Sequence, residues 1–165
     1  MFALGVERTI EQDPVFALRV LVDIAIRALS PAVNDPTTAV QVMDHLGDML
    51  RTVGATAGLD GRLEFRDAQG HVRVVLPAHR FEDFLSLGVT EIRRYGAQSI
   101  QVMRRLRAML IELQESVLAE YQAAVGAELR RLDATVSESL GASADGDLAS
   151  VADRQGIGGP RHPRK

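Results

Sequence analysis

The sequence contains no cysteine among its 165 residues. Without cysteine, the chain can form neither a disulfide framework nor a thiolate metal site, and it has no thiol nucleophile. It also lacks an excess of basic residues, because the formal net charge is −3 and the pI is about 5.8. Nucleic-acid-binding domains usually carry a strongly basic surface, so we expect no nucleic-acid partner.

Long apolar runs are missing too. No stretch reaches the roughly eighteen uninterrupted apolar residues that indicate a membrane-spanning helix. The first ten residues, MFALGVERTI, have neither the basic start nor the long apolar run of a signal peptide. We therefore expect a soluble, cytoplasmic chain without a transmembrane segment. A hydrophobic content of 46% over this length is enough for one domain with a real core.

Motifs for catalysis and metal binding are also lacking. The sequence has no HExxH pair, no Gly-x-Ser-x-Gly elbow, no phosphate loop and no dinucleotide fingerprint. The four histidines fall on different predicted elements, so no two of them have the spacing of metal ligands on one helix or strand. We expect no metal and no cofactor, and the sequence favours a protein that is not an enzyme.

What is present is dominated by the stretch from Asp13 to Leu50. Residues 15–29 are apolar except for Arg19, Asp23 and Arg27, which follow one another at four-residue steps along one narrow stripe. A helix that is apolar over most of its surface is normally buried. The pattern predicts a central helix that other helices surround, with Asp23 either solvated beside Arg27 or held by a buried partner or ligand.

A turn bounded by prolines, SPAVNDP, joins this helix to the next. Each proline pushes the residue before it into an extended conformation, so Asp35 can cap the second helix, as Asp13 before Pro14 can cap the first. Capping and turn formation explain these polar residues without a ligand. The alternative is an anion or polar ligand held near the helix N-terminus. The residues that we assign to ligand binding under this alternative are Arg8, Gln12, Asp13, Asp23, Ser30, Asn34 and Asp35.

Apolar periodicity predicts the other helices. A second helix follows the turn and ends at Gly54, and a third runs from about residue 80 to Tyr95. A long helical tract follows over about residues 99–140, with a break near Gly126. Five arginines cluster around the start of this tract, and we expect them on solvated helix faces or, alternatively, as a basic patch against anionic lipid headgroups. They are Arg93, Arg94, Arg104, Arg105 and Arg107.

Alternating residues on both sides of an Asp-Ala-Gln-Gly turn predict a β-hairpin from Arg62 to Leu76, which Pro77 ends. Because a lone hairpin is only marginally stable, we expect it to pack on the helices or to pair with another chain. Residues 141–165 have few apolar anchors and predict a disordered tail. The predicted fold is mostly α: a helical bundle around a buried central helix, with one small β-hairpin, in a single domain over residues 1–140.

Part of the sequence resembles a known bacterial family. The run ERTIEQDPVFALRVLVDIAIRALSPAVNDPTTAV, residues 7–40, is similar to predicted membrane proteins catalogued as domain of unknown function twenty-two fifty-four. A second match is FEDFLSLGVTEIRRYG, residues 81–96. The motifs that carry the first match are Arg8-Thr9, Gln12-Asp13, Asp23-Ile24-Ala25, Ala28-Leu29-Ser30-Pro31 and Asn34-Asp35-Pro36. The resemblance implies the C-terminal, soluble part of a membrane protein, in a truncated or split form, and implies no activity, substrate or cofactor.

These observations favour a helical interaction or regulatory module. It would act as a homo-oligomer or with a membrane-embedded partner, at the inner face of the cell membrane, and peripheral contact with lipid is possible. The alternative is a small-ligand-binding or catalytic domain that uses the polar residues around the turn at residues 30–36. A third possibility is the cytosolic part of a transport-related membrane protein.

Overall fold

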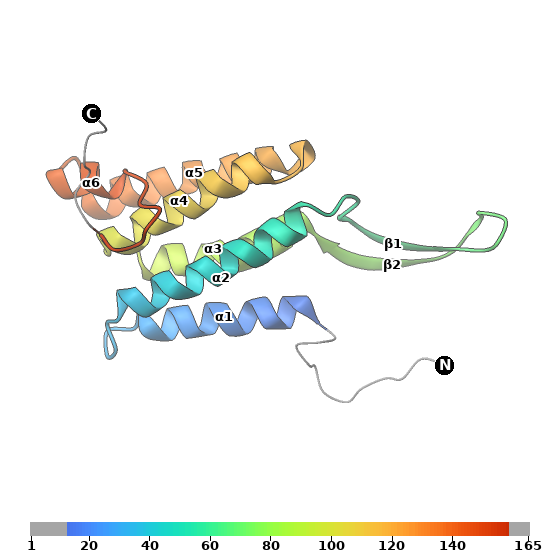
Figure 1. The fold of residues 1–165 in the computed structure, drawn as a ribbon, viewed down its shortest axis with the longest axis horizontal. Coiled ribbons are helices and arrows are strands. Elements are labelled where there is room, and N and C mark those ends of the chain that lie inside the picture. Colours follow the sequence, from blue (N-terminus) through green and yellow to red (C-terminus); the bar gives the residue numbers. More distant parts are fainter. Residues whose placement is uncertain (1–12, 159–165) are drawn as a thin grey trace.

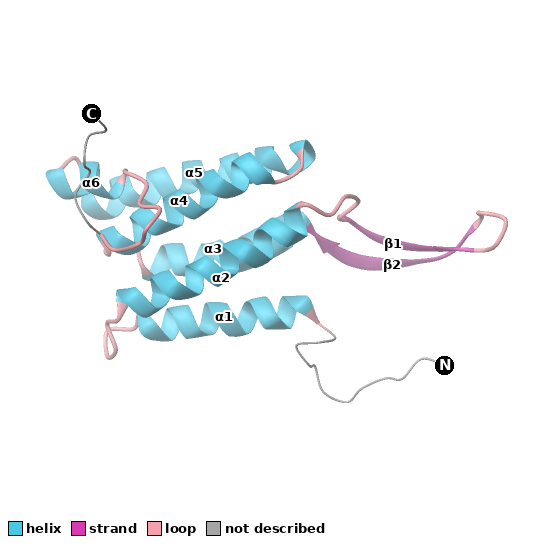
Figure 2. Ribbon diagram, viewed as in Figure 1, coloured by secondary structure: helices cyan, strands magenta, loops and turns pink. Residues whose placement is uncertain are grey.

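The computed structural model describes residues 13–158, which form a helical bundle with one antiparallel hairpin (Figures 1 and 2). The mostly α fold and the small hairpin that the sequence predicts are confirmed. The helices are α1 (Pro14–Ala28), α2 (Pro36–Gly54), α3 (Phe81–Tyr95), α4 (Ile100–Ser116), α5 (Ala119–Leu140) and α6 (Ala144–Ala149). The strands are β1 (Asp60–Arg66) and β2 (Val72–Arg80).

The bundle surrounds a buried helix, but that helix is α4 and not α1. Helices α2, α3, α5 and α6 all contact α4, and nine of its 17 residues are buried. By contrast, α1 lies at one edge of the bundle and packs mainly on α2 and α3 (Figure 1). Ile24, on the side of α1 away from these two helices, is 44% exposed. The prediction that residues 15–29 are wrapped on all sides is therefore wrong, because two neighbours cover only one stripe of a helix. That buried stripe consists of Leu18, Val22, Ala25 and Ala28.

The predicted long tract is two helices, α4 and α5, which fold back on each other. The break lies at Val117 and Leu118, which have extended backbones, and not near Gly126, which lies inside α5. The N–H of Leu118 donates to the carbonyl of Gly54 at 3.0 Å. Val117 packs so closely on Gly54 that a Cβ there would lie 2.4 Å from Cγ1 of Val117. A tertiary contact with the end of α2 therefore sets the position of the break.

The hairpin has the predicted turn but is longer than predicted. Gly70 closes the turn with a φ of 86°, a conformation that glycine adopts without strain. Pro77 lies inside β2, which continues to Arg80, so the prediction that Pro77 ends the strand is wrong. Proline is tolerated there because β2 is an edge strand. The hairpin projects away from the helices (Figure 1), so it does not pack along them, and pairing with another chain stays a prediction.

The folded domain continues past the predicted start of the tail. Helix α6 packs on α4 and α5, and Ala149 is fully buried. The side chain of Arg104 donates to the carbonyl of Val151 at 3.2 Å. The backbone carbonyl of Arg104 accepts from the N–H of Asp153 at 3.1 Å. Hydrogen bonds to Arg104 therefore hold the segment after α6 on the bundle, although this segment has few apolar residues. Of the predicted tail, residues 159–165 lie outside the described residues.

Replacing Gly54 by alanine tests the contact that sets the α4–α5 break. Because the new Cβ would clash with Val117, we expect Gly54→Ala to lower the free energy of unfolding by about 1–3 kcal/mol in urea denaturation. Gly126→Ala is the matched control, since its Cβ would meet nothing closer than 3.6 Å. Alanine inside α5 is expected to raise the free energy of unfolding by about 0.4–1 kcal/mol. Equal effects of the two substitutions would contradict the close packing.

Candidate functional site

Those of the predicted ligand-binding residues that the structure describes do not come together in one site. Arg8 and Gln12 lie outside the described residues. Asp13 caps the start of α1, where its carboxylate accepts from the N–H groups of Val15 at 3.0 Å and Phe16 at 3.2 Å. A helix of 15 residues is about 22 Å long, so Asp13 and the turn that follows α1 lie at opposite ends of this helix.

The other predicted residues follow α1 and its turn. Asp23 is exposed in the middle of α1 and pairs with Arg19. The carbonyl of Ser30 accepts from the N–H of Asn34 at 2.8 Å, and Asn34 has a left-handed φ of 48°, which asparagine tolerates. Asp35 caps α2 as predicted. Asn34 lines a cleft of about 380 Å³ beside Tyr95 and Ser99. Ligand binding by the whole set stays a prediction.

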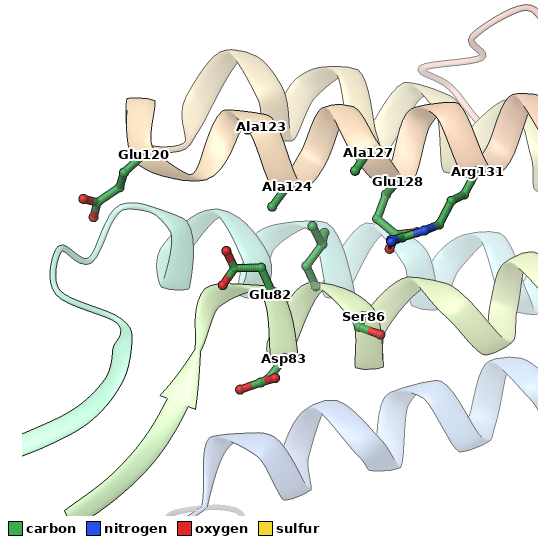
Figure 3. Close-up of a pocket in the computed structure, with 10 residues that line it drawn as sticks. Glu82, Asp83, Ser86, Glu120, Ala123, Ala124, Ala127, Glu128 and Arg131 are labelled. Carbon is green, nitrogen blue, oxygen red and sulfur yellow. The ribbon is translucent and has the colours of Figure 1, made fainter.

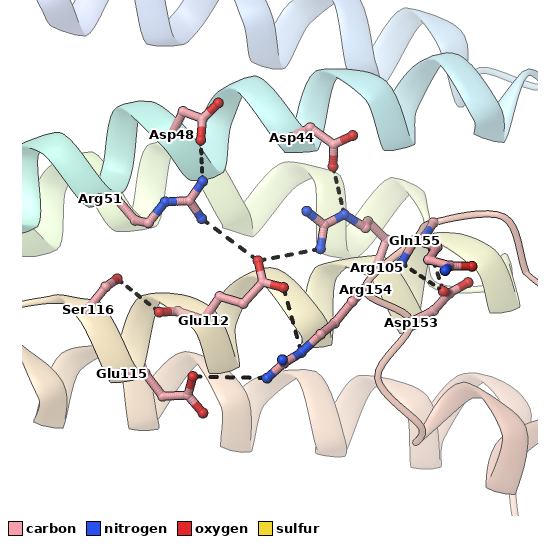
Figure 4. Close-up of polar contacts among 11 residues, drawn as sticks. Asp44, Asp48, Arg51, Arg105, Glu112, Glu115, Ser116, Asp153, Arg154 and Gln155 are labelled. Carbon is pink, nitrogen blue, oxygen red and sulfur yellow. Dashed lines mark hydrogen bonds and ion pairs between the residues drawn. The ribbon is translucent and has the colours of Figure 1, made fainter. Parts of the chain in front are cut away.

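A network of charged side chains joins α2, α4 and the segment after α6 (Figure 4). Its centre is the Glu112 carboxylate, which lies 3.7–3.8 Å from the guanidinium groups of Arg51, Arg105 and Arg154. Arg105 also donates to Asp44 on α2 at 2.7 Å. The network ties the C-terminal segment to the middle of the bundle.

The arginine-rich stretch is used inside the bundle. Arg104 and Arg105 are buried, and Arg107 pairs with Asp133 on α5. Arg93 donates to the hydroxyl of Thr135 at 2.6 Å. The prediction of solvated faces is therefore wrong for this stretch. Of its five arginines, only Arg94 on α3 is exposed. Helix packing decides this, because the same spacing could equally have placed the charges in water.

A cleft of about 430 Å³ lies between α3 and α5 (Figure 3). Its walls carry several carboxylates and its floor on α5 is mostly alanine. Glu82 points from α3 toward α5, Glu128 points from α5 toward α3, and Glu120 lies at the end of the cleft, at the start of α5 (Figure 3). Among residues 13–158, no three histidine, aspartate or glutamate side chains are arranged to hold a metal ion. The excess of carboxylates suits an amine or guanidinium group instead.

Glu128 is the unusual member of this cleft. Its side chain is 3% exposed, and one carboxylate oxygen pairs with Arg131. The other oxygen, Oε2, is buried and has no hydrogen-bond partner. A buried acceptor without a partner destabilises the fold, so Glu128 is not explained by stability alone. Sequence reasoning missed it, because a glutamate in an amphipathic helix normally lies on the solvated face, whereas the tertiary structure buries this one.

Comparison with known proteins now places the chain. Residues 1–112 match the family described as Predicted membrane protein (DUF2254). The chain belongs to this family. The resemblance seen in the sequence is thus confirmed, and the DUF2254 match covers α1, α2, the hairpin, α3 and most of α4. No helix among the described residues of this DUF2254 chain is long and apolar enough to cross a membrane.

The chain is similar to uncharacterized mycobacterial proteins. It is 44% identical over 107 residues to one from Mycobacterium bovis and to two from strains of Mycobacterium tuberculosis. The alignment covers 65% of this chain and 20% of each relative, so the chain spans about a fifth of their length. No solved structure matches it. These relatives are uncharacterized and assign no activity.

The cap of α2 gives a test by pH. Thr38 donates to the Asp35 carboxylate from its hydroxyl at 2.5 Å and its N–H at 3.0 Å, which lowers the pKa of Asp35 below 3.8. Because the pKa of Asp35 is lower in the folded state, the ionised cap stabilises the fold fully at pH values above the unfolded-state pKa. This stabilisation is lost as the pH falls through the folded-state pKa. We expect Thr38→Val to raise the pKa of Asp35 toward 3.8 in an NMR titration. Thr37→Val, which leaves that hydroxyl in place, is the control, and an equal rise there would refute the assignment.

Replacing Glu128 tests whether it costs stability. Because Glu128→Met removes a buried unpartnered oxygen and leaves Arg131 in solvent, we expect the free energy of unfolding to rise by about 1–2 kcal/mol. Urea denaturation measures this change. Glu120→Met, at an exposed position of the same cleft, is the control and is expected to change stability by less than about 0.5 kcal/mol. A loss of stability in Glu128→Met would mean that the carboxylate is a structural group.

Proposed function

We propose that this chain is a helical interaction module of the DUF2254 family, which docks on a membrane-embedded partner through one face of its β-hairpin. The observation that carries the proposal is the composition of that face. Leu63 lies opposite Leu76, and Phe65 lies opposite Val74, so the four side chains share one face of the ribbon. They are 45–51% exposed. We call these four residues the apolar face.

The apolar face is held at a fixed place beyond the helices. At the base of the hairpin, the hydroxyl of Tyr121 accepts from the N–H of Leu59 at 3.2 Å and donates to the carbonyl of Thr56 at 3.0 Å. The ring of Tyr121 stacks on Phe81, with ring centroids 4.6 Å apart. Burying each large apolar side chain of the hairpin would contribute roughly 1.5–3 kcal/mol. A partner groove that covers the ribbon would therefore gain substantial binding energy.

The family supports a membrane-embedded partner. Its members are described as predicted membrane proteins, and the mycobacterial relatives are about five times as long as the part that matches this chain. The segments of the relatives outside the match are thus candidates for the partner. On this proposal the module lies at the cytoplasmic face of the membrane and acts by binding, without chemistry of its own.

Membrane recruitment tests the proposal. The full chain would be co-expressed with the segments of a mycobacterial relative that lie outside the matched part, and its membrane-bound fraction would be measured. Because a charge on the apolar face cannot enter an apolar groove, we expect Phe65→Lys to reduce binding about tenfold or more, which corresponds to at least 1.4 kcal/mol. Val75→Lys, on the opposite face of the ribbon, is the matched control.

Two results would contradict the docking proposal. One is equal recruitment of the wild type and Phe65→Lys. The other is equal binding of the wild type to membranes that lack the relative's segments, which would make lipid the binding surface. Circular dichroism of each variant confirms that the helices remain folded.

A further inference from the structure

We propose that the outer edge of β1 pairs with β1 of a second copy of this chain, so that two hairpins join into one four-stranded antiparallel sheet. The inference deepens the proposed function, because it names a partner for the same hairpin. It uses the edge of the ribbon, however, and not the apolar face. The two surfaces can therefore be tested separately.

The two edges of the hairpin differ in what they offer another strand. Proline has no N–H, so Arg62 and Pro77 form a non-hydrogen-bonded pair, and the nitrogen of Pro77 faces the outer edge of β2. An edge without this donor resists further strands. By the alternation of the ladder, the N–H and C=O groups of Arg62 and Glu64 face the outer edge of β1. Only β1 therefore presents an edge without proline.

The polar groups on the β1 edge have only local partners among the described residues. The N–H of Arg62 donates to the exposed carboxylate of Asp60 at 3.1 Å. The side chains of Arg62 and Asp60 lie 3.6 Å apart, and those of Arg66 and Glu64 lie 2.5 Å apart. All four side chains are exposed, so these ion pairs stabilise the strand little. These ion pairs within β1 could therefore be replaced by ion pairs with a second strand at a small cost in free energy.

The charge pattern of β1 selects one register. With a two-fold axis at Leu63, Arg62 faces Glu64 of the second copy and Asp60 faces Arg66 of the second copy. Symmetry repeats both pairs, which gives four opposite-charge pairs across the interface. If the axis moves to Glu64, the two Glu64 side chains face each other and Arg62 faces Arg66. If it moves to Arg62, two arginines face each other. Like charges directly opposite destabilise a sheet. An axis at Gly61 or Phe65 avoids them but gives only two opposite-charge pairs, so the axis at Leu63 is preferred.

Pairing at this edge also joins the two apolar faces. Residues directly opposite in neighbouring strands share a face, so Leu63 of one copy lies beside Leu63 of the other on the same side of the sheet. The dimer then presents the apolar face twice, side by side. Three or more strands with a hydrophobic face are more stable than one hairpin, so pairing would also strengthen the ribbon.

Single cysteines test the register, because the chain has none of its own. In the proposed sheet, the two Leu63 residues form a non-hydrogen-bonded pair with Cα atoms about 4.5 Å apart, within the range of a disulfide. We expect Leu63→Cys in the full chain to form disulfide-linked dimers under mild oxidation. Glu64→Cys is the matched control, since its Cα atoms would be about 8 Å apart, which is beyond that range.

Charge exchange tests the pairing without cysteine. Static light scattering of the wild type is expected to give twice the chain mass of 17.9 kDa. Glu64→Arg places two arginines opposite each other and is expected to weaken dimerisation about tenfold or more. The double variant R62E/E64R restores opposite charges and is expected to recover the dimer. Glu138→Arg makes the same charge change at an exposed position of α5 and is the control.

Three results would overturn the inference: a monomeric wild type at all concentrations, stronger crosslinking of Glu64→Cys than of Leu63→Cys, or no recovery in R62E/E64R. Circular dichroism shows that each variant is folded. If dimerisation fails while Phe65→Lys still abolishes membrane recruitment, the edge pairing is wrong and the proposed function stands. If dimers form and membrane recruitment is absent, the proposed docking is wrong and the edge pairing stands.

Discussion

The close contact of Val117 with Gly54 is the constraint on which the rest of the structure depends. It ends α4, and the hydrogen bond from Leu118 to the Gly54 carbonyl starts α5 in the opposite direction. One turn later, Tyr121 stacks on Phe81 and bonds to the backbone at the base of the hairpin. The same corner therefore places α5 on α4, opens the acidic cleft between α3 and α5, and fixes where the hairpin leaves the bundle.

A few charged side chains are buried in the otherwise apolar bundle, and several apolar side chains are exposed on the hairpin. Arg104, Arg105 and Glu128 are buried in the bundle. The half-buried Glu112 lies near Arg105 on α4 and Arg154 of the C-terminal segment. The hairpin, in contrast, exposes apolar side chains to solvent. Arg105 is paired with Asp44, but the buried Oε2 of Glu128 and Nη1 of Arg105 have no hydrogen-bond partner among the described residues. The proposed binding surface is on the hairpin, where these apolar side chains are exposed.

The relation to the family adds a second reason for this view. The matched part ends near the C-terminus of α4, yet α5 and α6 bury that helix. The part of the bundle that carries the hairpin is thus the part that this chain shares with much longer relatives. In the two proposals, one face of the ribbon binds a membrane-embedded partner and one edge pairs with a second copy.

The sequence alone determined the first three helices, the hairpin with its Gly70 turn, the Asp13 and Asp35 caps and the family. Each of these depends on residues a few positions apart or on a continuous motif. Tertiary structure alone decided that α1 lies at the edge, that the α4–α5 break is at Val117, that the segment after α6 is folded and that Glu128 is buried. These features depend on how many elements meet at one place, and periodicity along a single helix carries no information about that.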